Sequence, residues 1–165
     1  MDQNAAQKFG VATREQIERL TGRQHLEEII RGFLPAPPIA QTLSFSLIEV
    51  SDGFVAFEGN PGPHLLNPLG TVHGGWVLTL IDSVTGCAVH STLPAGVAYT
   101  TIETKANFSR PITPNTGVVR AEGRVVGKGR TIISAEGRVF DDSGRLLAHG
   151  TSTLMVLKPE NRGTG

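Results

Sequence analysis

The sequence has little of several features that mark particular classes of protein. A single cysteine, Cys87, excludes an intrachain disulfide and is typical of a reducing compartment. Lys plus Arg and Asp plus Glu both number 15, and this lack of net charge argues against nucleic acid or an anionic membrane as a partner. No apolar run approaches the roughly 20 residues that a membrane span needs. The first residues also lack the basic and apolar regions of a secretory signal, so we expect a cytoplasmic protein.

The length of 165 residues fits one domain, since roughly 100–200 residues per domain is usual. We divide the chain into an N-terminal arm at 1–38, a main unit at 39–158 and a flexible tail at 159–165. Capping-box patterns predict two short helices in the arm, which begin after Thr13 and Thr21. Residues up to about 12 show no periodicity, and we expect them to fray. The arm is interpreted as a packing appendage, with one wall of a substrate pocket as the alternative.

Alternation of apolar and polar residues predicts strands on both sides of one long helix. Two strands lie within 43–58 and four within 97–156, and the helix between them, at about 74–92, is apolar nearly all round. We therefore expect an α+β fold in which a curved antiparallel sheet of about five to six strands wraps one central helix. Small residues on the predicted inner face would let the sheet approach the helix closely: Gly123, Ala135 and Gly137.

The start of this helix carries the residues best suited to chemistry. A turn-rich loop delivers His73, Gly74 and Gly75 to the first helical turn, where backbone N–H groups are unpaired and the helix dipole is positive. Such groups stabilise an oxyanion, and adjacent glycines there indicate close approach of a ligand or another backbone. About two turns later Asp82 is a lone carboxylate on an apolar helix, which is costly unless it is partnered or used. From the residues alone, Asp82 serves chemistry, faces solvent or hydrogen-bonds a neighbouring hydroxyl.

The order of elements resembles the hotdog fold, and the residues at the helix start resemble the acyl-CoA thioesterases of the phenylacetate-degradation type. In that family an Asn precedes a His-Gly-Gly motif by six residues, and an acidic residue follows the His by nine. This chain has both spacings, from Asn67 to His73 and from His73 to Asp82. The resemblance covers roughly residues 40–157 and leaves the arm outside. It implies an enzyme that hydrolyses acyl-CoA to a free acid and CoA.

The resemblance also implies a role for each matched residue. The backbone N–H of Gly74 polarises the thioester carbonyl, while His73 and Asn67 shape that end of the site. Asp82 acts as general base on water or as nucleophile, and in hotdog dimers it comes from the subunit facing the one that donates Gly74. We therefore expect a homodimer or a dimer of dimers with shared sites. A Ser or Thr on the strand after the helix positions the water, and the best match is Thr101, followed by Thr100 and Thr104.

Binding of CoA would involve Gly75 and basic residues at strand ends. Three such residues lie beside or near glycines and either contact the phosphates of CoA or are solvated turn charges: Arg110, Lys128 and Arg130. CoA enters as part of the substrate, and we expect no separate cofactor. We also expect no metal, because the histidines lack the spacing of zinc ligands. Cys87 is interpreted as a small buried side chain.

Two alternatives of other classes stay open. One is an enoyl-thioester hydratase or dehydratase of the same fold, which a carboxylate nine residues after the motif fits less well. The other is a non-catalytic acyl-CoA-binding module, such as a ligand sensor, which would bind without releasing thiol. The sequence does not determine the acyl group, although few aromatics (5%) and many small residues indicate a roomy pocket.

Overall fold

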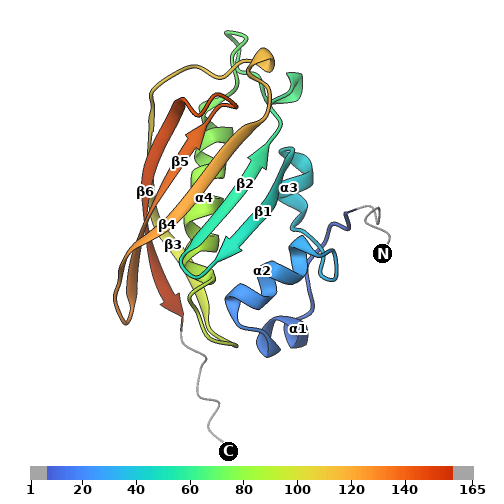
Figure 1. Ribbon diagram of the computed structural model, residues 1–165, viewed down its shortest axis with the longest axis vertical. Coiled ribbons are helices and arrows are strands. Elements are labelled where there is room, and N and C mark those ends of the chain that lie inside the picture. Colours follow the sequence, from blue (N-terminus) through green and yellow to red (C-terminus); the bar gives the residue numbers. More distant parts are fainter. Residues whose placement is uncertain (1–6, 158–165) are drawn as a thin grey trace, which may run out of the picture.

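The computed structural model describes residues 7–157, in which a six-stranded sheet curves around one long helix, α4 (Gly74–His90). Figure 1 shows α4 lying along the concave side of the sheet. The strand order is β1-β2-β4-β5-β6-β3, and all neighbours are antiparallel. The predicted α+β hotdog architecture is confirmed. The strands are β1 (Phe45–Ser51), β2 (Phe54–Gly59), β3 (Ala98–Phe108), β4 (Val119–Lys128), β5 (Ile132–Phe140) and β6 (Leu146–Leu157).

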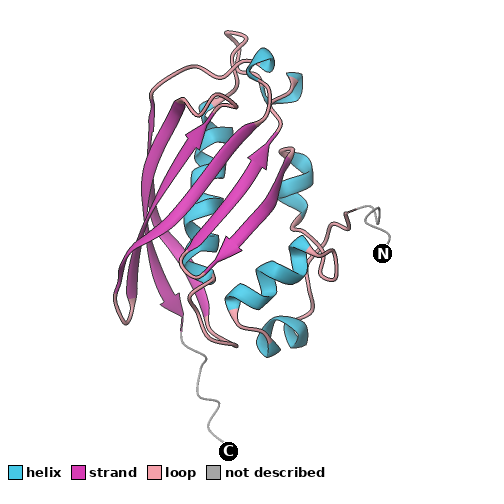
Figure 2. Ribbon diagram, in the orientation of Figure 1, coloured by secondary structure: helices cyan, strands magenta, loops and turns pink. Residues whose placement is uncertain are grey.

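The core lies between α4 and the inner face of the sheet (Figure 2). Leu80, Ile81 and Val84 on α4 have no exposed surface, so the helix is buried along this side. Close approach depends on glycine, because a Cβ on Gly123 would lie 2.1 Å from the Val84 carbonyl oxygen. Gly150 on β6 also lies close to α4, with its Cβ position 3.0 Å from Ile81 Cγ2. Inward-facing glycines thus set the distance between sheet and helix.

The arm contains more structure than its sequence indicated. The capping boxes at Thr13 and Thr21 begin α1 (Arg14–Arg19) and α2 (Gly22–Ile30), as predicted. A third helix, α3 (Pro38–Thr42), was not predicted. Pro38 takes its first helical position, where the missing N–H of proline is not needed.

The expectation that residues up to about 12 fray is wrong for 8–10. That segment forms a parallel bridge with Ala36, in which the Gly10 N–H donates to the Ala36 carbonyl at 2.9 Å. The expectations for residues 1–6 and for the tail at 159–165 lie outside the described residues.

The arm docks on the C-terminal end of α4. The Gly22 N–H donates to the Leu93 carbonyl at 3.0 Å, and a Cβ on Gly22 would lie 1.7 Å from the His90 carbonyl oxygen. Next to this contact, His25 Nδ1 and His90 Nε2 lie 3.1 Å apart. Burial lowers the pKa of both rings, to about 4 for His90, to which the neighbouring His25 also contributes. Both imidazoles are therefore neutral at pH 7.

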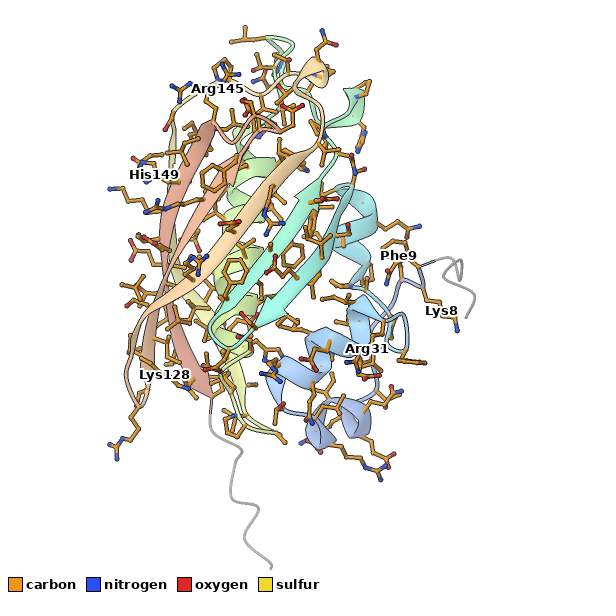
Figure 3. All side chains as sticks on the ribbon, in the orientation of Figure 1. Lys8, Phe9, Arg31, Lys128, Arg145 and His149 are labelled. Atoms are coloured by element: carbon orange, nitrogen blue, oxygen red, sulfur yellow. The ribbon has the colours of Figure 1, made fainter. Side chains whose placement is uncertain are left out.

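Acidification should weaken this docking. An unfolded histidine takes up a proton near pH 6.5, whereas folded His90 does so only near pH 4, so stability falls as the pH drops between these values. We expect His90 to contribute a loss on the order of 1 kcal/mol per pH unit there. Urea unfolding at pH 7 and pH 5 measures it. His90→Gln should show a smaller loss between the two pH values, while His149→Gln, at an exposed position on β6 (Figure 3), should match the unchanged protein. Equal losses in all three proteins would contradict the assignment.

Candidate active site

The N-terminus of α4 is capped by His73, and this leaves one backbone N–H free for a ligand. His73 Nδ1 accepts a hydrogen bond of 2.8 Å from the Gly75 N–H. A Cβ on Gly75 would lie only 2.9 Å from that Nδ1, so glycine is needed for the cap to form. The Gly74 N–H, at the first helical position, has no acceptor among residues 7–157. It carries the partial positive charge of the helix end and is a donor for a developing oxyanion.

Asn67 holds the loop that leads into this helix. Its Oδ1 accepts from the N–H groups of Leu69 at 2.9 Å and Thr71 at 3.3 Å, and its Nδ2 donates to Thr71 Oγ1 at 2.8 Å. The Asn67 N–H also donates to the Thr71 carbonyl. The hydrogen bonds of the side chain therefore stabilise the loop, and one amide N–H of Asn67 is left for a ligand.

Asp82 is half-buried and takes its partner from the sheet rather than from its own helix. Thr104 Oγ1 donates to Asp82 Oδ1 at 3.1 Å and lies 3.0 Å from Ser152 Oγ, which accepts from Thr85 Oγ1 at 2.7 Å. Thr104 gives its one proton to the carboxylate and therefore accepts from Ser152, while Thr85 Oγ1 shares its proton between Ser152 Oγ and the Ile81 carbonyl oxygen, 2.8 Å away. The chain polarises toward Asp82 and fixes the orientation of its carboxyl group.

The threonine that contacts Asp82 is thus Thr104, and not Thr101, which was the best match to the family pattern. The reason is a bulge in β3 between Thr101 and Glu103 opposite β6. Thr101 and Thr104 are both half-buried, while the two residues between them are exposed. The bulge therefore shifts the strand's register by one residue, which sequence spacing does not reveal. The sequence did not predict that Thr85 and Ser152 belong to this hydrogen-bonded chain. Thr85 could have been found, since it lies three residues after Asp82 on one helix face. No sequence pattern points to Ser152.

Valine at position 104 should reduce turnover. It keeps the shape of threonine and removes the hydroxyl that donates to Asp82. A hydrogen bond to a charged group is worth roughly 1.5–3 kcal/mol, so we expect kcat to fall about 10- to 100-fold. The matched control is Thr101→Val, on the same strand, which should lower kcat far less. Thiol-release kinetics of both variants decide between the two threonines, and a larger loss at position 101 would restore Thr101.

Gly74 and Asp82 are too far apart in one protomer to act on the same carbonyl. They are separated by eight residues of a continuous helix, which is about 12 Å along the axis. A reacting carbonyl and its water need both groups within hydrogen-bond reach. Within one chain, Gly74 and Asp82 therefore do not meet at a single carbonyl.

A cavity of about 260 Å³ opens beside Gly74. Phe108 and Arg110 line it, and the Phe108 ring lies 3.3 Å from the position of a Cβ on Gly74. Arg110 is exposed and uses Nη1 to donate to the Leu146 carbonyl at 2.7 Å, which fixes its guanidinium at the mouth. The other two predicted CoA contacts do not gather here. Lys128 donates to the Thr92 carbonyl beyond the C-terminal end of α4 and lies at the end of the molecule away from Arg145 (Figure 3). Arg130 lies in the turn that follows Lys128, between β4 and β5.

Other candidate chemistry finds no support in the described residues. Within 7–157, no three His, Cys, Asp or Glu side chains gather as metal ligands would. Burial raises the pKa of Cys87 to about 12, with a smaller contribution from the charge of Asp82, so this thiol is a poor nucleophile. No helix in this part of the chain is both long and apolar enough to cross a membrane.

Comparison with known proteins places this geometry in a family. A model of the thioesterase superfamily matches residues 69–148, the segment from the loop before α4 into β6. The crystal structure of a phenylacetic acid degradation-related protein from Ralstonia eutropha JMP134 is 30% identical, with a TM-score of 0.72 over 79% of this chain and 98% of that one. The chain belongs to the thioesterase superfamily. Its resemblance to the phenylacetate-degradation type is confirmed at the level of fold and family.

Two further relatives of this thioesterase-superfamily protein are informative. "Putative esterase SSO2140" of Saccharolobus solfataricus is 29% identical over 133 residues, which cover 81% of this chain and 91% of that protein. The structure of smu.793 from Streptococcus mutans UA159 is bound to acetyl CoA; it is 26% identical, with a TM-score of 0.63 over 69% of this chain and 89% of that one.

Proposed function

We propose that this protein hydrolyses the thioester bond of an acyl-CoA to a free acid and CoA. Water adds to the carbonyl carbon and passes a proton to Asp82, while the Gly74 N–H receives the charge that develops on the carbonyl oxygen. Collapse of the tetrahedral intermediate breaks the C–S bond, and the proton returns to the CoA sulfur. If Asp82 is instead the nucleophile, its oxygen adds first and water then hydrolyses the resulting anhydride.

The observation that carries this proposal is the pairing of a free donor with an oriented carboxylate. The Gly74 N–H has no acceptor in the described part of the chain, and Asp82 is fixed by Thr104. The acetyl CoA in the Streptococcus mutans relative supports an acyl-CoA as the substrate class. Arg110, at the mouth of the cavity beside Gly74, keeps most of its guanidinium N–H groups free for a CoA phosphate. Lys128 and Arg130 would reach CoA only from a neighbouring subunit.

Two subunits would complete each site. Within residues 7–157, β3 is a sheet edge with one unpaired side, and its Ile102 and Phe108 side chains are each 56% exposed. Long edge strands with exposed apolar residues invite pairing with another chain. Pairing of β3 with β3 about a two-fold axis would bring the α4 helices side by side in opposite directions. Gly74 of one protomer would then face Asp82 of its partner, and we propose a homodimer, alone or within a dimer of dimers.

Release of free thiol from a panel of acyl-CoAs tests the proposed function. The panel should include short, medium and long straight chains and an aromatic acyl group, and the time course should show catalytic turnover without added metal. Saturable binding of acyl-CoA with no thiol release would contradict hydrolysis and favour the non-catalytic binding module. One turnover in ¹⁸O-labelled water separates the two roles of Asp82. A nucleophilic carboxylate whose anhydride is hydrolysed at the Asp82 carbon transfers its own unlabelled oxygen to the first product, whereas a general base always delivers labelled oxygen from water, so an unlabelled first product assigns the nucleophile.

A further inference from the structure

A cavity of about 560 Å³ lies between the N-terminal arm and the C-terminal half of α4. This volume is within the roughly 300–1,000 Å³ of small-molecule sites, whereas ordinary protein interiors contain few voids larger than a water. We call it the arm chamber. Its walls come from the arm, from β1 and β2, from the start of β3 and from α4, and include Ala12, Ile17, Leu26, Phe45, Cys87 and Tyr99.

The walls of the arm chamber are apolar and uncharged. Among residues 7–157, no Asp, Glu, Lys or Arg lines the chamber. Its polar members are also uncharged at neutral pH: burial lowers the pKa of His25 and His90 and raises that of the Cys87 thiol and the Tyr99 hydroxyl. Such walls exclude the phosphates of CoA and any charged acyl group, because burial of an unpaired charge is costly. They favour a hydrocarbon chain.

The arm chamber adjoins the catalytic carboxylate. Cys87 follows Asp82 by five residues on α4, about 7.5 Å along the axis. Tyr99 and Thr104 are both half-buried positions of β3, and Thr104 is the residue that donates to Asp82. Tyr99 packs against α4 where Gly86 makes room, since a Cβ there would lie 2.8 Å from the tyrosine oxygen. The charge of Asp82 contributes to the raised pKa of both Cys87 and Tyr99, two residues that line the chamber, so the carboxylate lies close to this wall.

We infer that the arm chamber holds the acyl chain of the substrate, and that the substrates are acyl-CoAs with medium or long unsubstituted chains. The N-terminal arm is then one wall of the binding site, which decides between the two interpretations of the arm. This inference rests on the proposed thioesterase function. It also explains why the arm is bridged to itself at Ala36 and anchored at the end of α4, because a wall that selects chain length must be fixed.

The test is to fill the chamber by enlarging a side chain of the arm that lines it. Ala12→Phe places a ring in the chamber from a half-buried position, and Ala95→Phe makes the same change at an exposed position in the loop after α4. The specificity of each protein is the ratio of kcat/KM for dodecanoyl-CoA to that for hexanoyl-CoA. We expect this ratio to fall about tenfold or more in Ala12→Phe, since a few methylenes in an apolar pocket are worth that much. It should be unchanged in Ala95→Phe. Ile17→Trp is a second filling variant, should Ala12→Phe fail to fold.

Calorimetric titration with free dodecanoate shows whether the chamber assignment is wrong or the proposed hydrolysis is wrong. An unchanged kcat/KM ratio in both folded filling variants, with turnover intact, would overturn the chamber assignment and leave thioesterase activity standing. If no acyl-CoA is hydrolysed but dodecanoate binds, and binds at least tenfold more weakly to Ala12→Phe than to Ala95→Phe, the chamber assignment stands and hydrolysis is refuted. If dodecanoate does not bind and no thiol is released, both are refuted.

Discussion

Replacement of Asp82 by asparagine is expected to reduce thioester hydrolysis by about 10²–10⁴-fold, the contribution of a positioned general base. Asparagine has the same shape, and its Oδ1 still accepts from Thr104, so the hydroxyl chain to Ser152 is kept. What is lost is the ability to take a proton from water, or to attack the carbonyl. The loss should therefore appear in kcat, with little change in acyl-CoA affinity.

Steady-state thiol release and calorimetric binding of acyl-CoA separate these effects. The control is Asp142→Asn, which makes the same change at an exposed position in the turn after β5 and should leave kcat unchanged. Thermal unfolding of the Asp82 variant should match the unchanged protein, since Asp82 is only half-buried. Near-full activity of Asp82→Asn would remove Asp82 from the mechanism and return it to the role of a polar residue at the edge of the core.

Proline at position 74 is expected to lower kcat by about 10²–10³-fold, the usual effect of losing one oxyanion donor. Gly74 is the first residue of α4, where proline is well tolerated because that N–H makes no helical bond. The preceding residue, His73, already has the extended backbone that a following proline requires (φ −62°, ψ 133°). Gly74→Pro therefore removes the donor with little cost to the helix.

The matched control is Gly74→Ala, which keeps the N–H. Both substitutions place a Cβ near Phe108, 3.3 Å from its ring, so the steric effect of this Cβ is common to the two variants. A much greater loss of kcat in the proline variant than in the alanine variant assigns the difference to the N–H. Equal losses would mean that contact with Phe108, and not the donor, matters.

Mixing the two inactive variants tests whether the halves of the site come from different subunits. With random assortment, about half of the dimers of Gly74→Pro and Asp82→Asn are mixed, and each mixed dimer has one site with both groups intact. Co-expression should therefore restore activity to about a quarter of the unchanged protein. If Gly74 and Asp82 acted within one chain, every site would lack one group and no activity would return.

Much of the fold was predictable because its signals are local. The alternation along β4 and β5 and the capping boxes at Thr13 and Thr21 depend only on neighbouring residues, and the structure confirms them. The resemblance at Asn67, His73 and Asp82 was likewise readable from spacing along the chain. The short helix α3 was not predicted, because the local preference of Pro38 fits both the end of one helix and the start of another.

The sequence by itself determined the six strands, the long helix, the family to which they belong, and the positions of Gly74 and Asp82 on that helix. Only the tertiary structure decided what surrounds them: Thr104 in place of Thr101, Ser152 as a link to Thr85, and the arm as a wall of the chamber beside Cys87. The physical reason is how far apart along the chain the interacting residues lie. Periodicity and capping follow from residues a few positions apart, whereas a bulge in β3, a hydroxyl chain between α4 and β6, and a cavity under the arm depend on segments brought together only by folding.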